Sequence, residues 1–194
     1  NLQVIYPTTP ASYFHALRRQ LRREFRKPLI VMSPKSLLRH KRVISTFEDL
    51  TGDRTFHRVL WDDQTDLVAD NKIRRVVLCS GKVYYELLEA KEKRDIRDVY
   101  VLRLEQLYPF PDKALGEEIS RFSKADVVWC QEEPKNAGAW SFVEPRLEDL
   151  LAEIGSKIRR PVYAGPPEMA SPAPGSLAHH KEQMASLVDD ALTI

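Results

Sequence analysis

The sequence predicts an α/β fold of three layers, α/β/α, in which helices cover both faces of a mostly parallel sheet. Segments that favour strands alternate with segments that favour helices from residue 73 onward. Most of the strand segments are unbroken runs of Val, Ile and Leu, which is typical of strands buried on both faces. A length of 194 residues with 43% hydrophobic side chains suits one globular domain. We therefore expect residues 1–194 to form a single domain.

The chain begins with a short strand and an amphipathic helix. Residues 2–6 are predicted to form a strand, and Pro10 suits the first turn of a helix that runs to about Phe25, with Thr9 as its cap. At about 100° per residue, the arginines fill one face of this helix and the apolar side chains another. We expect the apolar face to lie in the core; it comprises Tyr13, Phe14, Leu17, Leu21 and Phe25.

The remaining elements are assigned in order along the chain. Pro28 ends the first helix, residues 29–32 form a strand, and residues 43–70 show no regular pattern. Residues 80–81 form a turn, Pro145 predicts a break within a helix, and the Pro- and Gly-rich residues 165–176 favour an extended loop. The expected strands are residues 76–79, 99–104, 126–130 and 162–163, and the expected helices are residues 82–93, 111–122, 140–154 and 177–192.

No group of residues has the spacing of a self-contained catalytic or metal site. The turn at Gly81 and Lys82 lacks the other residues of a nucleotide-binding loop. Glu132 and Glu133 are neighbours in sequence after a strand, so their side chains point to opposite sides and do not form a catalytic pair. The five histidines lack ligand spacing, and the two cysteines are typical of buried, reduced thiols. We expect no catalytic, cofactor-binding or metal-binding residue, and infer that the chain serves a larger enzyme.

Positive charge is concentrated near the N-terminus. Residues 1–45 carry ten Lys and Arg side chains against one acid, Glu24, although the whole chain has a net charge of only +2. Lys35, Arg39 and Lys27, with the helix arginines, suit phosphate groups. The alternatives are a solvated or interdomain face and a nucleic-acid surface. No nucleic-acid-binding motif is present, and no apolar run approaches the roughly 18 residues that span a bilayer, so we expect neither nucleic acid nor a membrane as a partner.

The carboxyl ends of the parallel strands are expected to face a neighbouring domain or chain, because partners and ligands gather at this edge of such sheets. The loops there include residues 80–82, 106–109 and 131–140, and they carry large apolar side chains that are unusual in solvent. We predict that at least part of this set forms an exposed patch or a chain contact. The predicted interdomain edge comprises Lys82, Tyr108, Glu132, Glu133 and Trp140, with Phe110 beside them.

Four segments together resemble one enzyme family. They are PTTPASYFHALRR (7–19), PLIVMSPKSLLRH (28–40), VVLCSGKVYYELLE (76–89) with VLRLEQLYPFP (101–111), and VVWCQEEPKNAGAW (127–140). In order and spacing they are similar to the C-terminal domain of the thiamine-diphosphate-dependent, decarboxylating component of 2-oxoglutarate dehydrogenase, which has a transketolase C-terminal domain-like fold. The resemblance covers nearly the whole chain.

The resemblance implies that the chain is the C-terminal domain of a larger, homodimeric oxoglutarate dehydrogenase (succinyl-transferring). Thiamine diphosphate and Mg²⁺ would bind between upstream domains of the same protein. There 2-oxoglutarate would be decarboxylated in the citric acid cycle, and the succinyl group would pass to the lipoyl arm of the acyltransferase component. The chain alone would be inactive, and its location would be the bacterial cytoplasm or the mitochondrial matrix of a eukaryote. The same domain of a 2-oxoadipate dehydrogenase is the alternative, because the substrate pocket lies upstream.

The resemblance also implies that some members of the family bind an adenine-nucleotide effector, acetyl-CoA, against this domain, so a module that senses a phosphate-bearing effector (acetyl-CoA or AMP) is an alternative function. The resemblance matches Thr8 to a small hydroxyl position and Lys35 to a retained lysine, whereas Lys27 stands where responsive relatives have arginine. Lysine cannot grip a phosphate with two parallel hydrogen bonds as arginine does, which argues against effector binding. The candidate effector residues are Thr8, Lys27, Lys35 and Arg39.

Overall fold

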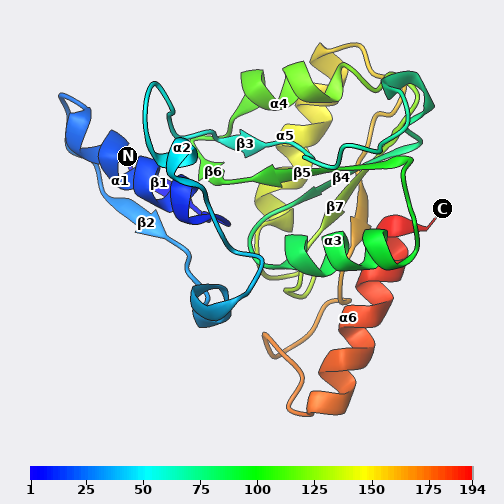
Figure 1. The fold of residues 1–194 in the computed structure, drawn as a ribbon. Coiled ribbons are helices and arrows are strands. Elements are labelled where there is room, and N and C mark those ends of the chain that lie inside the picture. Colours follow the sequence, from blue (N-terminus) through cyan, green and yellow to red (C-terminus); the bar gives the residue numbers. More distant parts are fainter. Residues whose placement is uncertain (194) are drawn as a thin grey trace.

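The computed structural model describes residues 1–193 and contains two β-sheets (Figure 1). The larger sheet has five strands in the order β3-β5-β4-β7-β8. β4 pairs in parallel with both β5 and β7, and β7 pairs in parallel with β8, whereas β3 is antiparallel to β5 at the edge. These strands are β3 (Val59–Leu60), β4 (Arg75–Cys79), β5 (Val99–Leu104), β7 (Asp126–Cys130) and β8 (Val162–Ala164).

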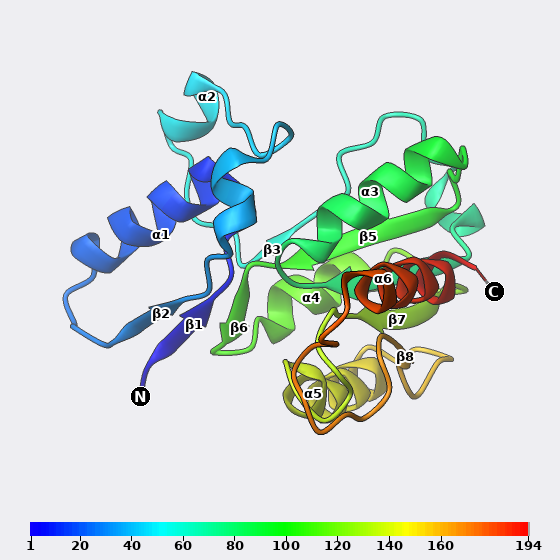
Figure 2. The same cartoon turned by 90° about the horizontal axis from the view of Figure 1, so that it is seen from below.

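Helices cover both faces of the larger sheet, as Figures 1 and 2 show. One face carries α3 (Val83–Lys93) and α6 (Leu177–Leu192), and the other carries α4 (Asp112–Ile119) and α5 (Trp140–Glu153). Successive strand side chains enter opposite layers: Val76 and Leu78 pack with α4 and α5, and Val77 and Cys79 with α3 and α6. None of the helices in residues 1–193 is long and apolar enough to span a bilayer. The predicted three-layer fold with a mostly parallel sheet is confirmed.

A smaller sheet joins the N-terminus to the middle of the chain. Its order is β2-β1-β6, with β1 (Gln3–Ile5) parallel to β2 (Leu29–Val31) and antiparallel to β6 (Gln106–Tyr108). One face of it packs against α1 (Pro10–Arg22), whose first turn is capped by the Thr9 hydroxyl. Because β6 follows β5 after a single residue, the main chain ties the two sheets together.

Several short elements depart from the sequence predictions. Residues 106–109, expected to be a loop, contain β6, and the unassigned residues 43–70 contain α2 (Phe47–Leu50) and β3. Two short 3₁₀ helices, η1 (Lys35–Arg39) and η2 (Asp70–Lys72), complete the connections. The break predicted at Pro145 is wrong, because α5 continues through this residue.

α1 is rotated relative to the orientation that the sequence predicts. The five apolar side chains expected in the core are between 42% and 75% exposed. The buried residues of α1 are instead Ser12, His15 and Ala16. From the arginine face, the Arg19 guanidinium lies over the Phe56 ring, 4.2 Å from its centroid. The prediction is wrong because hydrophobic periodicity identifies the apolar face of a helix but not what covers it.

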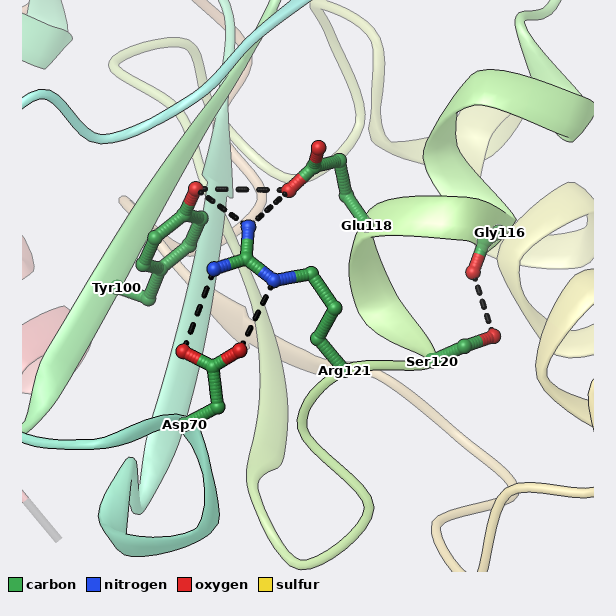
Figure 3. A network of polar contacts seen from close by, with 6 residues as sticks. All are labelled: Asp70, Tyr100, Gly116, Glu118, Ser120 and Arg121. Carbon is green, nitrogen blue, oxygen red and sulfur yellow. Dashed lines mark hydrogen bonds and ion pairs between the residues drawn. The ribbon is translucent and has the colours of Figure 1, made fainter.

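Charged side chains around the larger sheet form ion pairs within the chain. Arg121, just beyond α4, donates to both carboxylate oxygens of Asp70 (3.0 and 3.2 Å) and to Glu118 (2.7 Å), as Figure 3 shows. In the interior, Lys91 Nζ lies 2.5 Å from Asp62 Oδ2, and both side chains are buried. Each of these cations therefore has a carboxylate partner from another part of the chain.

Candidate functional site

The candidate site lies at the carboxyl edge of the larger sheet, where the sequence predicts an interdomain edge. From β4 the chain first forms β5 on one side and later forms β7 on the other side. Such a reversal of strand order marks the place at which sheets of this kind bind ligands. The loops that follow β4 and β7 meet at this point, and they carry residues 80–82 and 131–139.

Tyr6, which directly follows β1, fills the space between these loops. A Cβ atom at Gly81 would lie 2.2 Å from two carbons of the Tyr6 ring, so the ring packs directly on the glycine. Gly81 also has a φ of +78°, a backbone conformation that residues other than glycine rarely adopt. Burial, followed by the charges of Glu132 and Glu133, raises the pKa of the Tyr6 hydroxyl to about 12. The N-terminal segment thus occupies the position that a ligand would take in a related sheet.

Lys82 and Glu132 form an ion pair beside Tyr6, joining the loop after β4 to the loop after β7. The Glu132 side chain is 16% exposed and that of Lys82 is 32% exposed. Burial raises the pKa of the Glu132 carboxyl, an effect that the adjacent Lys82 ammonium group opposes. Two of the predicted edge residues are therefore engaged with each other inside the chain. Their contact holds the two loops together.

Gln131 organises the loop after β7, and sequence reasoning missed it. The side chain is buried, and its single amide group satisfies six partners. The amide oxygen accepts hydrogen bonds from the Trp129 indole (2.9 Å) and from the Ala139 and Trp140 backbone amides (3.2 and 3.0 Å). The amide nitrogen donates to the carbonyl oxygens of Glu133, Pro134 and Ala137. The one available signal was a polar residue placed directly after a buried apolar strand.

The predicted aromatic set is only partly exposed. Tyr108 is 38% exposed and Phe110 is half-buried, whereas Trp140 is 4% exposed. Trp140 does not belong to the exposed part of this set, because it opens α5 and turns inward against the Tyr163 ring, with centroids 5.1 Å apart. Tyr108 instead lines a cavity of about 560 Å³ between the small sheet and the loop after β7, together with Tyr6 and Phe142.

Glu105 fastens the N-terminal segment to the end of β5. Its carboxylate is fully buried and accepts hydrogen bonds from the Thr8 amide (2.9 Å), the Thr8 hydroxyl (2.6 Å) and the Ser12 hydroxyl (2.5 Å). Burial raises the pKa of the Glu105 carboxyl, and the nearby Arg103 opposes that effect. Thr8, one of the candidate effector residues, is therefore engaged within the chain.

The other three candidate effector residues lie on the surface. Lys27 precedes β2, whereas Lys35 and Arg39 belong to η1 beyond the other end of that strand. All three are exposed, and within residues 1–193 none forms an ion pair. The structure thus separates Lys27 from Lys35 and gives the Thr8 hydroxyl a partner inside the chain.

Two family models match this chain, and they meet between β2 and α2. The model described as "2-oxoglutarate dehydrogenase C-terminal" matches residues 44–192, and the model described as "Transketolase, pyrimidine binding domain" matches residues 1–41. The 2-oxoglutarate dehydrogenase E1 components of Brucella anthropi, Brucella ovis and Brucella canis are each 61% identical to the chain over 199 aligned residues. Each alignment covers 99% of this chain and 20% of the relative, so the chain spans about a fifth of these proteins. The chain belongs to the 2-oxoglutarate dehydrogenase E1 family, as the C-terminal region of that protein.

Proposed function

We propose that this chain is the interdomain and dimer-forming scaffold of a 2-oxoglutarate dehydrogenase (succinyl-transferring). The complete protein decarboxylates 2-oxoglutarate with thiamine diphosphate and Mg²⁺ and passes the succinyl group to the lipoyl acyltransferase component in the citric acid cycle. The chain contributes surface and rigidity rather than catalytic groups. The outward-facing apolar side of α1 is the observation that carries this proposal.

The apolar side of α1 is too large to be an ordinary solvent-facing surface. Four apolar side chains of α1, together with Phe25 just beyond it, keep 42–75% of their surface exposed. On the side of the small sheet away from α1, Leu2, Ile30 and Met32 are also 38–46% exposed. Exposed apolar surfaces of this kind mark interfaces. We assign the contact to other parts of the same protein and to the second subunit, because the chain spans only about a fifth of its relatives.

Residues 1–194 act as one structural unit in this proposal. β6 belongs to the segment that matches the C-terminal family model, yet it completes the small sheet of the N-terminal segment. Glu105, directly before β6, holds Thr8 and Ser12 through three hydrogen bonds. A contact between α1 and another domain is therefore coupled to the larger sheet through these buried hydrogen bonds.

The residues of this chain do not form a thiamine diphosphate site. A diphosphate is normally held through Mg²⁺ by several oxygen ligands. Within residues 1–193 no three His, Cys, Asp or Glu side chains are arranged to hold a metal ion. The buried carboxylate of Glu105 already accepts three hydrogen bonds from its own chain. We therefore assign the cofactor to other parts of the protein and derive no catalytic step from this chain.

The proposal is tested by charging the apolar side of α1 in the full-length protein. Leu17→Lys with Leu21→Lys places two ammonium groups in the proposed interface, and we expect loss of dimer in size-exclusion chromatography and loss of 2-oxoglutarate decarboxylation. The matched control is Leu177→Lys, since Leu177 is 69% exposed on α6 and Leu21 is 75% exposed on α1. We also expect no carbon dioxide release by the chain alone with 2-oxoglutarate, thiamine diphosphate and Mg²⁺. A full-length α1 variant that dimerises and turns over like the parent would contradict the proposal, as would turnover by the chain alone.

A further inference from the structure

The cavity that Tyr108 lines is a candidate ligand site that the scaffold role does not use. It lies at the carboxyl edge of the larger sheet, between β1 and β6 of the small sheet and the loop that leads from β7 to α5, elements that Figure 2 shows. Its volume of about 560 Å³ falls within the roughly 300–1,000 Å³ of typical ligand pockets. Small molecules commonly bind at this edge of such sheets, where the strand order reverses. Both the size and the place of the cavity therefore suit a small ligand.

Aromatic rings form much of the wall of this cavity. They belong to Tyr6, Tyr108, Trp129 and Phe142. The Tyr108 and Phe142 rings meet edge to face, with centroids 6.3 Å apart. The Trp129 indole already donates its hydrogen bond to Gln131, so it has no free polar group to offer a ligand. Ring faces carry partial negative charge and attract cations, so this wall suits an apolar molecule with a positive group better than one with a negative group.

Glu133 is the only charged residue among those of residues 1–193 that line the cavity. Its side chain is only partly exposed, and within the same residues it forms no hydrogen bond or ion pair. Gly138 makes room for the carboxylate, because a Cβ atom at this position would lie 3.1 Å from Glu133 Oε2. The aromatic wall is therefore accompanied by one carboxylate that the chain does not engage.

The cations near Glu133 in sequence and space are engaged elsewhere. Lys82 pairs with Glu132, the neighbouring carboxylate. Lys135 lies two positions beyond Glu133, and its Nζ is 5.7 Å from the centroid of the Tyr163 ring. Neither ammonium group forms an ion pair with Glu133 within residues 1–193. A negative charge without a counter-ion thus remains beside the aromatic wall.

We infer that this cavity binds an organic cation, a primary ammonium or guanidinium group on an apolar body. The cationic group pairs with the Glu133 carboxylate, and the Tyr108 and Phe142 rings attract it further. The apolar body occupies the remaining space, where Val4 and Leu107 form part of the wall. An anion would be repelled by Glu133, and a neutral molecule would leave this carboxylate without a counter-charge. The inference does not depend on the scaffold role, because it concerns the ligand chemistry of one cavity.

Calorimetric titration of the full 194-residue chain with phenethylamine and with 2-phenylethanol tests the inference, because the two probes have nearly the same shape and only the amine is charged at neutral pH. We expect saturable binding of phenethylamine, at least about tenfold tighter than any binding of the alcohol, since only the amine gains a charge-assisted hydrogen bond. Glu133→Gln keeps the volume of the side chain and should remove this preference. The matched control is Glu144→Gln, because Glu144 is also partly exposed and without an ion pair within residues 1–193, but does not line the cavity.

Two further titrations examine the aromatic wall and the source of the cation. Tyr108→Leu keeps an apolar wall but removes a ring face, so it should weaken phenethylamine binding about two- to fivefold. Phenethylamine binding by the full-length protein would identify a free small molecule as the natural ligand. Binding by the 194-residue chain but not by the full-length protein would show that a basic side chain from another part of the protein fills the cavity.

Three outcomes would overturn the inference. One is the absence of saturable phenethylamine binding by the 194-residue chain at millimolar concentration and low salt. Another is equal affinity for the amine and the alcohol, or an unchanged preference in Glu133→Gln. The third is an equal loss of affinity in the Glu144→Gln control, which would show only general attraction to an acidic surface. Circular dichroism checks that each variant is folded, which we expect of Glu133→Gln because the Glu133 carboxylate supports no hydrogen bond within residues 1–193.

Discussion

Replacing Gly81 with alanine tests how firmly Tyr6 is seated at the carboxyl edge of the larger sheet. The new Cβ would lie 2.2 Å from two ring carbons of Tyr6, far inside van der Waals contact. It would also force an alanine to adopt a φ of +78°. The substitution therefore combines a conformational cost at position 81 with a steric cost that depends on the Tyr6 ring.

The two costs can be separated by their size and by their dependence on Tyr6. A left-handed conformation costs an L-residue about 1–2 kcal/mol, whatever its neighbours are. Overpacking against a seated ring costs about 1–3 kcal/mol more. We expect Gly81→Ala to lower the free energy of unfolding by about 2–5 kcal/mol in the parent chain. In a Tyr6→Ala background only the conformational cost remains, about 1–2 kcal/mol.

Urea unfolding of the four proteins in this double-mutant cycle gives the coupling free energy directly. Gly155→Ala is the matched control, because Gly155 has a φ of +69° and a Cβ atom there would meet no heavy atom within 4 Å. Its cost should be about 1–2 kcal/mol in both backgrounds. If Gly81→Ala costs the same with and without the Tyr6 ring, the ring moves aside freely, and the proposed seating of the N-terminal segment is refuted.

Three further predictions concern the buried polar groups. Lys91→Met should lower the free energy of unfolding by about 3–5 kcal/mol, because it leaves the buried Asp62 carboxylate without its counter-charge. Asp62→Leu in the same chain should restore most of the loss in urea unfolding. Gln131→Leu should lower the free energy of unfolding by roughly 3 kcal/mol or more, since it leaves several buried donors and acceptors without partners. The loop after β7 should also lose protection from amide hydrogen exchange measured by NMR. The folded-state pKa of Glu105 is raised above 4.5, so the folded protein holds a proton on this carboxyl that the unfolded chain releases. The stability that this group contributes should therefore fall as pH rises from 4.5 through the folded-state pKa. Glu105→Gln should remove this pH dependence from the measured free energy of unfolding.

The architecture of the larger sheet could be predicted because the residue patterns that determine it lie within short stretches of the sequence. A strand such as β4, with all five residues buried, needs a helix layer on each face, and an unbroken apolar run signals that requirement. The start of α1 was equally readable, since Thr9 and Pro10 are the residue types that favour a helix N-terminus. Each of these features depends on residues that are close together in sequence.

The site could not be predicted in the same way because it depends on how loops and helices are placed after the chain has folded. The Ala139 and Trp140 amides reach the Gln131 side-chain oxygen only because the chain turns at Gly138, where φ is +65°. Glu105 is set by hydroxyl groups about a hundred positions earlier in the chain. Trp140 looked like an edge residue until its helix was placed, because its exposure depends on the direction of α5 and not on its own neighbours.

The outward-facing apolar side of α1 and the arginines on the same helix have different energetic roles in association. Fully burying a large apolar side chain yields about 1.5–3 kcal/mol, so covering five that are roughly half-exposed yields several kcal/mol. That amount is comparable to the whole stability of a typical domain, about 5–15 kcal/mol. Exposed ion pairs contribute about 0–1 kcal/mol each, so the arginines cannot supply a similar amount by pairing with a partner. We therefore propose that the apolar side of α1 supplies most of the association free energy and that its arginine side orients what binds, which is the division of roles expected of apolar and charged surfaces at an interface.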